Sequence, residues 1–137
     1  MIINKNNYPE EILSATSLLL SISKADDNID RKEIELVKNI ITDFFNVNMD
    51  DLSNIIQISL QSLENATDLY EFGKILNDTF TYQDKVDFIC CAFEVAYADK
   101  NLHYLEEHFI KKISFILNVE HEDLIASKSE IKKYLNI

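Results

Sequence analysis

The chain has 137 residues, of which 47% are hydrophobic and 27% charged, and these proportions are ordinary for a single globular domain. Its net charge is −11 and its isoelectric point about 4.6. This acidity argues against nucleic acid and anionic membranes as main partners, because phosphate groups attract basic surfaces. One glycine and one proline are too few for a fold with many tight turns, so the composition favours helices joined by short polar connections.

The sequence also bears on the cellular compartment. No segment approaches the roughly 20 apolar residues that a membrane-spanning helix needs, and the N-terminal segment has no apolar stretch of signal-peptide length. The two cysteines, Cys90 and Cys91, are adjacent, which is a poor arrangement for a structural disulfide. We therefore expect a cytoplasmic protein with no direct membrane insertion.

Taken in chain order, the first apolar pattern at helical spacing follows Pro9 and ends near Lys24. Proline is favourable at the start of a helix because its missing N–H needs no partner there. Asp30 is the predicted N-cap of a second helix that runs to about Phe45. Glu33, three residues after Asp30, completes the pattern of a capping box.

A third helix is predicted from about Asp50 to a break at residues 65–67, and a fourth over about 67–79. The fourth carries Gly73, the only glycine, on its apolar stripe. A glycine inside a helix costs about 1 kcal/mol relative to alanine. We therefore expect another helix to cross closely at this position.

The second half of the chain predicts three more helices. Thr81 is a plausible cap for a fifth helix over about 82–97, followed by helices over about 104–117 and 122–135. No long stretch favours a strand. The prediction is a single all-α domain over residues 1–137, with about seven helices and with the first and fifth at its buried centre.

One stretch of the sequence occurs twice. Residues 25–33 read ADDNIDRKE and residues 98–106 read ADKNLHYLE, and an apolar helical run precedes each copy. This internal repeat predicts two helix–turn–helix units related by a pseudo-twofold axis, repeat one over about 10–64 and repeat two over about 82–135. At an offset of 73 positions, the identical pairs are Ala25/Ala98, Asp26/Asp99, Asn28/Asn101 and Glu33/Glu106.

An Ala-Asp-x-x-hydrophobic-x-x-x-Glu turn between two helices, present twice, resembles the tellurite-resistance TerB family and its wider TerB-like relatives. The resemblance covers nearly the whole chain. It implies an α-helical fold with an internal pseudo-twofold and an acidic surface that holds divalent cations. It also implies a role in bacterial stress-response complexes, including tellurite resistance, rather than catalysis.

The chain departs from the family pattern after the Asp of each turn. The family usually has glycine there, whereas this chain has Asp27 and Lys100. If the glycine serves a positive φ, the adjacent Asn28 and Asn101 are the next best residues for that conformation.

The acidic turns are the main candidate site, and two explanations of them remain open. Their carboxylates can form a site for Ca²⁺ or Mg²⁺, since both cations prefer oxygen ligands. Alternatively, the carboxylates accept hydrogen bonds from backbone N–H groups at helix starts, with no ligand involved. The residues concerned are Asp26, Asp30, Glu33, Asp99 and Glu106.

The fifth predicted helix carries the other candidates. Asp87 and Glu94 are seven residues apart and share a face, which fits either acid–base chemistry or structural hydrogen bonding. Cys90 and Cys91 lack the second cysteine pair that a thiolate zinc site needs, so we expect small, buried side chains.

The sequence thus predicts a non-enzymatic protein-interaction module. Its acidic turns would contact a basic surface or another stress-response component, with a divalent cation as a further element. Two alternatives remain. One is a small metal-dependent enzyme built on clustered carboxylates, and the other is a purely structural domain that self-assembles, for example as a homodimer.

Overall fold

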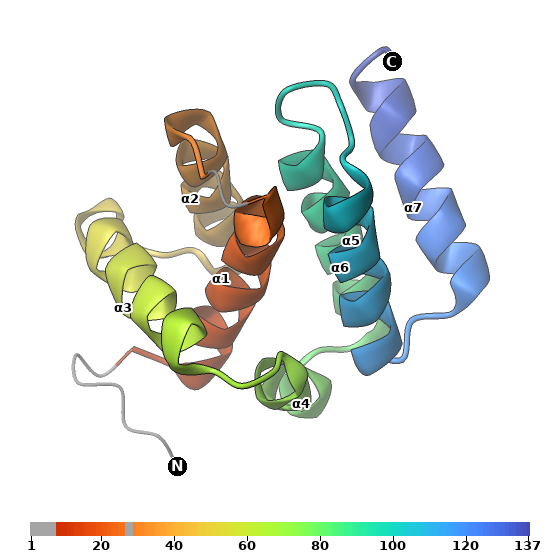
Figure 1. Ribbon diagram of the computed structural model, residues 1–137. Coiled ribbons are helices and arrows are strands. Elements are labelled where there is room, and N and C mark those ends of the chain that lie inside the picture. Colours follow the sequence, from red (N-terminus) through yellow and green to blue (C-terminus); the bar gives the residue numbers. More distant parts are fainter. Residues whose placement is uncertain (1–7, 27–28) are drawn as a thin grey trace.

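The computed structural model of the protein describes residues 8–26 and 29–137, apart from the side chain of Asp26. Within these residues the chain forms seven α-helices and two single-turn 3-10 helices, and no strand (Figure 1). The predicted all-α fold is confirmed. The α-helices are α1 (Glu10–Ser23), α2 (Arg31–Phe45), α3 (Leu52–Asn65), α4 (Tyr70–Thr79), α5 (Tyr82–Ala96), α6 (Tyr104–Ile116) and α7 (His121–Tyr134), and the 3-10 helices are η1 (Lys24–Asp26) and η2 (Met49–Asp51).

The predicted helix starts at α2 and α5 are confirmed by their caps. Asp30 Oδ1 accepts a hydrogen bond from the backbone N–H of Glu33 at 2.9 Å, and Glu33 Oε1 accepts one from the N–H of Asp30 at 3.1 Å. Thr81 and Asp84 form the same reciprocal pair at the start of α5. Each box satisfies two N–H groups that the helix itself cannot pair.

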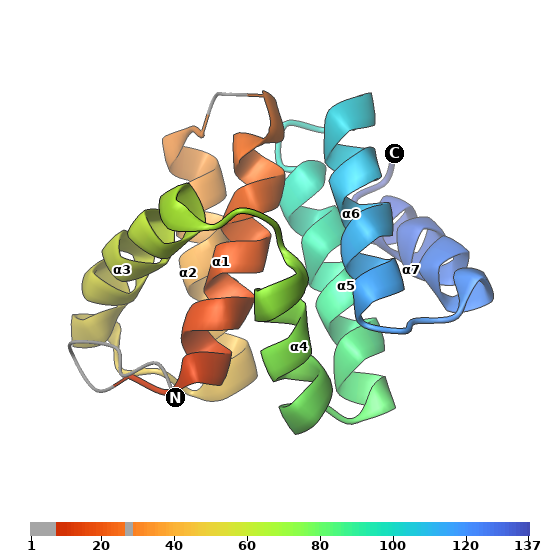
Figure 2. The same cartoon turned by 60° about the horizontal axis from the view of Figure 1, so that its bottom comes forward.

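The core forms around α1 and α5, as expected. Residues 13–23 of α1 are all buried, and this helix packs against α2, α3, α4, α5 and α6. Helix α5 packs against α1, α2, α6 and α7 (Figures 1 and 2). Because neighbours surround α1, even its small polar residues are buried. Ser17, for example, donates a hydrogen bond to the carbonyl oxygen of Leu13 at 2.8 Å.

The expected close crossing at Gly73 is present. A Cβ atom at this position would lie 2.1 Å from Cγ2 of Ile116 at the end of α6. Four residues further along α4, the side-chain amide of Asn77 donates to the carbonyl oxygen of Ile116 at 2.9 Å. Glycine is therefore required because α4 and α6 touch at van der Waals distance here.

The predicted start of the fourth helix is wrong by three residues. Helix α4 begins at Tyr70 rather than near residue 67. The carboxylate of Asp68 accepts a hydrogen bond from the backbone N–H of Tyr70 at 2.7 Å, and Leu69 is buried in the core. The Asp68 side chain therefore holds a turn where the sequence pattern suggested the first turn of a helix.

Candidate functional site at the acidic turns

The two acidic turns lie at the same end of the bundle. Turn one (residues 24–30) follows α1 and turn two (residues 97–103) follows α5, and Figure 2 shows both at the end where α2 and α6 begin. The 3-10 helix η1 of turn one packs against α6, so turn one of the first unit meets the second unit. The helices thus bring the two turns to one end of the bundle, although residues 27 and 28, including Asp27 and Asn28, lie outside the described residues.

In turn one, the described carboxylates are engaged in the capping box of α2. Asp30 is exposed to solvent, whereas Glu33 is buried with only 8% of its surface accessible. Buried charges are rare unless they are paired or hydrogen-bonded. The hydrogen bond from the N–H of Asp30 accounts in part for the burial of Glu33.

Turn two repeats this arrangement with different residues. Glu106 is buried at 2% exposure, and its Oε1 accepts a hydrogen bond from the backbone N–H of His103 at 3.2 Å. Asp99 is exposed, and its Oδ1 accepts one from the N–H of Asn101 at 3.0 Å. This hydrogen bond agrees with the alternative in which Glu106 accepts a backbone N–H at a helix start. Glu106 lies three residues after His103, as Glu33 lies three residues after Asp30.

The fit of these turns to a divalent cation is limited. Among the residues that the structure describes, no group of three or more His, Cys, Asp or Glu side chains is placed to hold a metal ion. The four described candidates, Asp30, Glu33, Asp99 and Glu106, each accept a backbone hydrogen bond. The fifth, Asp26, has no described side chain. A cation site at the turns therefore stays a prediction.

The backbone of turn two takes a left-handed conformation at Lys100, whose φ is 67°. The expectation that Asn101 would supply the positive φ is wrong, because Lys100 itself occupies it. The Asp99 side chain accepts the N–H of Asn101, which holds that residue in the turn. A non-glycine residue in this conformation is strained by roughly 1 kcal/mol.

A groove of about 530 Å³ lies between α2, turn two and the C-terminal end of α7. Three cationic side chains line it, from Arg31, Lys32 and Lys100, together with the carboxylates of Glu35 and Glu94. The surface beside turn two is therefore mixed in charge. Sequence reasoning did not find this groove, because it forms only where the start of α2 meets the second unit.

The predicted pair on α5 is unequal. Asp87 is exposed and accepts a hydrogen bond from the side chain of Gln83, whereas Glu94 is half-buried. Burial raises the pKa of Glu94 above its usual value of 4.5, and the nearby carboxylate of Asp43 raises it further. Mutual repulsion and desolvation both disfavour the charged form of Glu94.

The two cysteines, expected as small buried side chains, are partly buried and pack against the core. Burial raises the pKa of the Cys91 thiol to about 12, with further contributions from the charges of Glu94, Cys90 and Asp87. Burial also raises the pKa of Cys90. Since the thiolate is the reactive form, Cys91 is a poor nucleophile at neutral pH.

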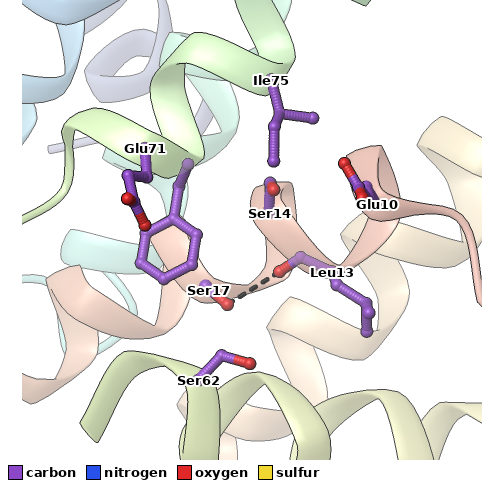
Figure 3. Close-up of a pocket in the computed structure, with 8 residues that line it drawn as sticks. Glu10, Leu13, Ser14, Ser17, Ser62, Glu71 and Ile75 are labelled. Carbon is purple, nitrogen blue, oxygen red and sulfur yellow. Dashed lines mark hydrogen bonds between the residues drawn. The ribbon is translucent and has the colours of Figure 1, made fainter. Parts of the chain in front are cut away.

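A smaller cavity of about 70 Å³ lies between α1, α3 and α4 (Figure 3). Glu10 and Glu71 lie on opposite sides of it, with the hydroxyl groups of Ser14 and Ser62 between them, and Phe72 also lines it. Among the described residues, the buried Oε1 of Glu10 has no hydrogen-bond partner.

None of the helices in the described part of the chain combines the length and the apolar character that crossing a membrane requires.

Together, the fold and the turns define a class of protein: an all-α bundle of two helix–turn–helix units, each with an acidic turn at the same end. A family model described as Tellurite resistance protein TerB matches residues 12–129, which is most of the chain. The chain therefore belongs to the TerB family, as its duplicated turn indicated. No curated protein and no solved structure gives a significant match.

Proposed function

We propose that this TerB-family protein is a non-enzymatic interaction module whose two acidic turns contact a partner protein with a basic surface. The observation that carries the proposal is the placement of both turns at one end of the bundle, where Asp30 and Asp99 are exposed. Exposed carboxylates of one sign accelerate association with an oppositely charged surface and help to select it. The cellular context that we propose, a cytoplasmic stress response that includes tellurite resistance, follows from the family.

The buried and the exposed carboxylates of the turns have different roles in this proposal. Glu33 and Glu106 are buried and accept backbone hydrogen bonds, so they support the turns from inside. Asp99 is exposed and remains accessible to a partner or a cation. We assign the contact to the aspartates of the turns and the scaffold to the buried glutamates.

The partner contact is tested by affinity capture from the native host with wild type and with Asp26→Asn/Asp99→Asn as baits. The expected result is a defined set of partners whose recovery falls sharply with the variant while its circular dichroism stays unchanged. A control bait, Asp78→Asn/Glu122→Gln, removes two exposed carboxylates outside the turns and should retain the partners. Equal recovery on all three baits would contradict the acidic turns as the contact.

The cation part of the proposal is tested by calorimetric titration of Ca²⁺ and Mg²⁺ into metal-free protein. Saturable binding that disappears in Asp26→Asn/Asp99→Asn and persists in Asp78→Asn/Glu122→Gln would support a cation site at the turns. If neither cation produces a heat of binding, the turn carboxylates act only as acceptors of backbone hydrogen bonds. The same variants can be compared for growth in tellurite, where loss of resistance only in the turn variant is expected.

A further inference from the structure

Helix α6 exposes a face that is unlike the rest of this acidic molecule. Of the seven α-helices, α6 is the one whose exposed positions include basic side chains and no carboxylate. Tyr104 and Phe115 are 80% and 82% exposed at its two ends. The exposed residues, here called the α6 face, are Tyr104, Leu105, His108, Lys111, Lys112 and Phe115.

The carboxylates of α6 are engaged elsewhere. Glu106 is buried at the helix start, and Glu107 forms an ion pair with Lys128 of α7 at 2.6 Å. This hydrogen-bonded pair raises the pKa of Lys128, which stays charged opposite Glu107. The α6 face is therefore locally positive, with Lys111 and Lys112 uncompensated on their own helix, in a chain of net charge −11.

The fold does not require these side chains. Helix α2 occupies the corresponding place in the first unit, and 73 positions before Tyr104 and Phe115 it carries Arg31 and Thr42. The residues 73 positions before His108 and Lys112 are Glu35 and Asn39, whereas Lys111 corresponds to Lys38, which pairs with Glu35 on α2 at 3.4 Å. A helix in this position thus folds without exposed aromatic rings and with mixed charge.

We propose that the α6 face is a docking surface for an acidic, amphipathic helical segment of a partner protein. Tyr104 and Phe115 are eleven residues apart on one face, or roughly 16 Å at 1.5 Å per residue. A partner helix of about the same length would cover both rings with apolar side chains and place its carboxylates against Lys111 and Lys112. Exposed aromatic rings beside cations are typical of the residues that dominate binding energy at interfaces.

Charge complementarity favours this occupant over a second copy of the chain paired through the same face. Two α6 helices in antiparallel register around the midpoint of Tyr104 and Phe115 would bring Lys111 of one copy against His108 of the other. This register places no carboxylate opposite Lys111, and the Glu107 that it places opposite Lys112 is already paired with Lys128. An acidic segment instead neutralises the face. This surface is separate from the acidic turns and carries the opposite charge, so it goes beyond the proposed contact.

The test uses a fluorescein-labelled, Glu/Leu amphipathic helical peptide of about 18 residues, with a Lys/Leu peptide of the same pattern as control. Fluorescence anisotropy follows binding to the full-length protein. The expected result is saturable binding of the acidic peptide, weakened about tenfold or more by Lys111→Glu/Lys112→Glu and also by Tyr104→Ala/Phe115→Ala. All four positions are exposed, so the variants should retain the wild-type circular dichroism and melting temperature.

Helix α2 provides the matched control. Lys32→Glu/Lys38→Glu changes the net charge by the same amount at the second helix of the first unit and should leave binding nearly unchanged. Equal weakening by the α2 and α6 charge variants would overturn the proposal, because net charge would then explain binding. No binding of the acidic peptide would also overturn it. So would a wild-type dimer in sedimentation velocity that Lys111→Glu/Lys112→Glu dissociates, since a second copy would then be the occupant.

Discussion

The two helix–turn–helix units, α1–α2 and α5–α6, share the same spacing of helices and turns, here called the frame, but expose different surfaces. Helices α1 and α5 end 73 positions apart, and α2 and α6 begin 73 positions apart. Each second helix has a buried glutamate in its first turn, Glu33 or Glu106, that accepts a backbone N–H. Outside this frame the units diverge, since α2 exposes mixed charges and α6 exposes rings and lysines.

Features common to both units serve the fold, and features of one unit alone are free to serve a partner. The pseudo-twofold relation itself stays a prediction.

The largest expected effect comes from overpacking the contact between α4 and α6 of the second unit. Gly73→Leu would place a side chain where α4 meets Ile116 of α6, with its Cβ only 2.1 Å from Cγ2 of Ile116. Overpacking of this kind should lower the free energy of unfolding by about 3 kcal/mol, measured by urea denaturation. Lys74→Leu, at the exposed neighbouring position, should change it by less than about 0.5 kcal/mol. Wild-type stability of Gly73→Leu would show that α4 and α6 are not in contact.

A smaller change in stability is expected from variants at the N-terminal caps of α2 and α6. Asp30→Ala removes the carboxylate that accepts the N–H of Glu33 and should cost about 1 kcal/mol in thermal or urea unfolding. At the corresponding N-cap of α6, His103→Ala tests the box that His103 and Glu106 form and should cost no more than Asp30→Ala. A neutral effect of Asp30→Ala would mean that the box does not stabilise α2.

The backbone strain in turn two should be removable. Because Lys100 has a φ of 67°, Lys100→Gly should raise the free energy of unfolding by about 0.5–1 kcal/mol, with glycine's extra freedom in the unfolded chain limiting the gain. Lys100→Ala provides the control, since alanine suffers the same strain. If both variants were equally stable, the left-handed conformation would not be a source of strain.

The last comparison concerns pH. Glu94 of α5 lies 73 positions after Ser21 of α1, so the first unit has no carboxylate there. Because burial and Asp43 raise the pKa of Glu94, the folded state binds its proton more tightly than the unfolded state. The stability that the proton on Glu94 contributes is therefore fully present at pH values below its usual pKa of 4.5. This contribution is lost as pH rises through the raised pKa of the folded state. Glu94→Gln should melt higher than wild type at pH 7, with a difference that shrinks towards pH 4. A difference independent of pH would contradict the shift.

The sequence predicted the features that depend on neighbouring residues. Apolar spacing located the helices, and the i to i+3 pattern of Asp30 and Glu33 identified a cap, because both signals arise within one or two helical turns. Gly73 was also informative, since a lone glycine on an apolar stripe has few explanations other than close packing.

Features that depend on two distant segments were not predictable. The groove beside turn two needs α2 and turn two to be placed together, and the pairing of Glu107 with Lys128 needs α6 against α7. The left-handed residue of turn two was assigned to Asn101 on intrinsic preference, yet the hydrogen bond from Asn101 to Asp99 sets the conformation. Of the candidate site, the sequence identified Asp30, Glu33, Asp99 and Glu106 but not which of them are buried.

The most direct test of the division between buried glutamates and exposed aspartates is the melting temperature of wild type, Glu33→Gln and Glu106→Gln, each in EDTA and in millimolar Ca²⁺. Glutamine also closes a capping box but is a weaker cation ligand than a carboxylate. If the buried glutamates are caps, calcium should shift the melting temperature of all three proteins by the same amount. A calcium-dependent rise in wild type that either glutamine variant loses would make that glutamate a ligand and contradict the assignment.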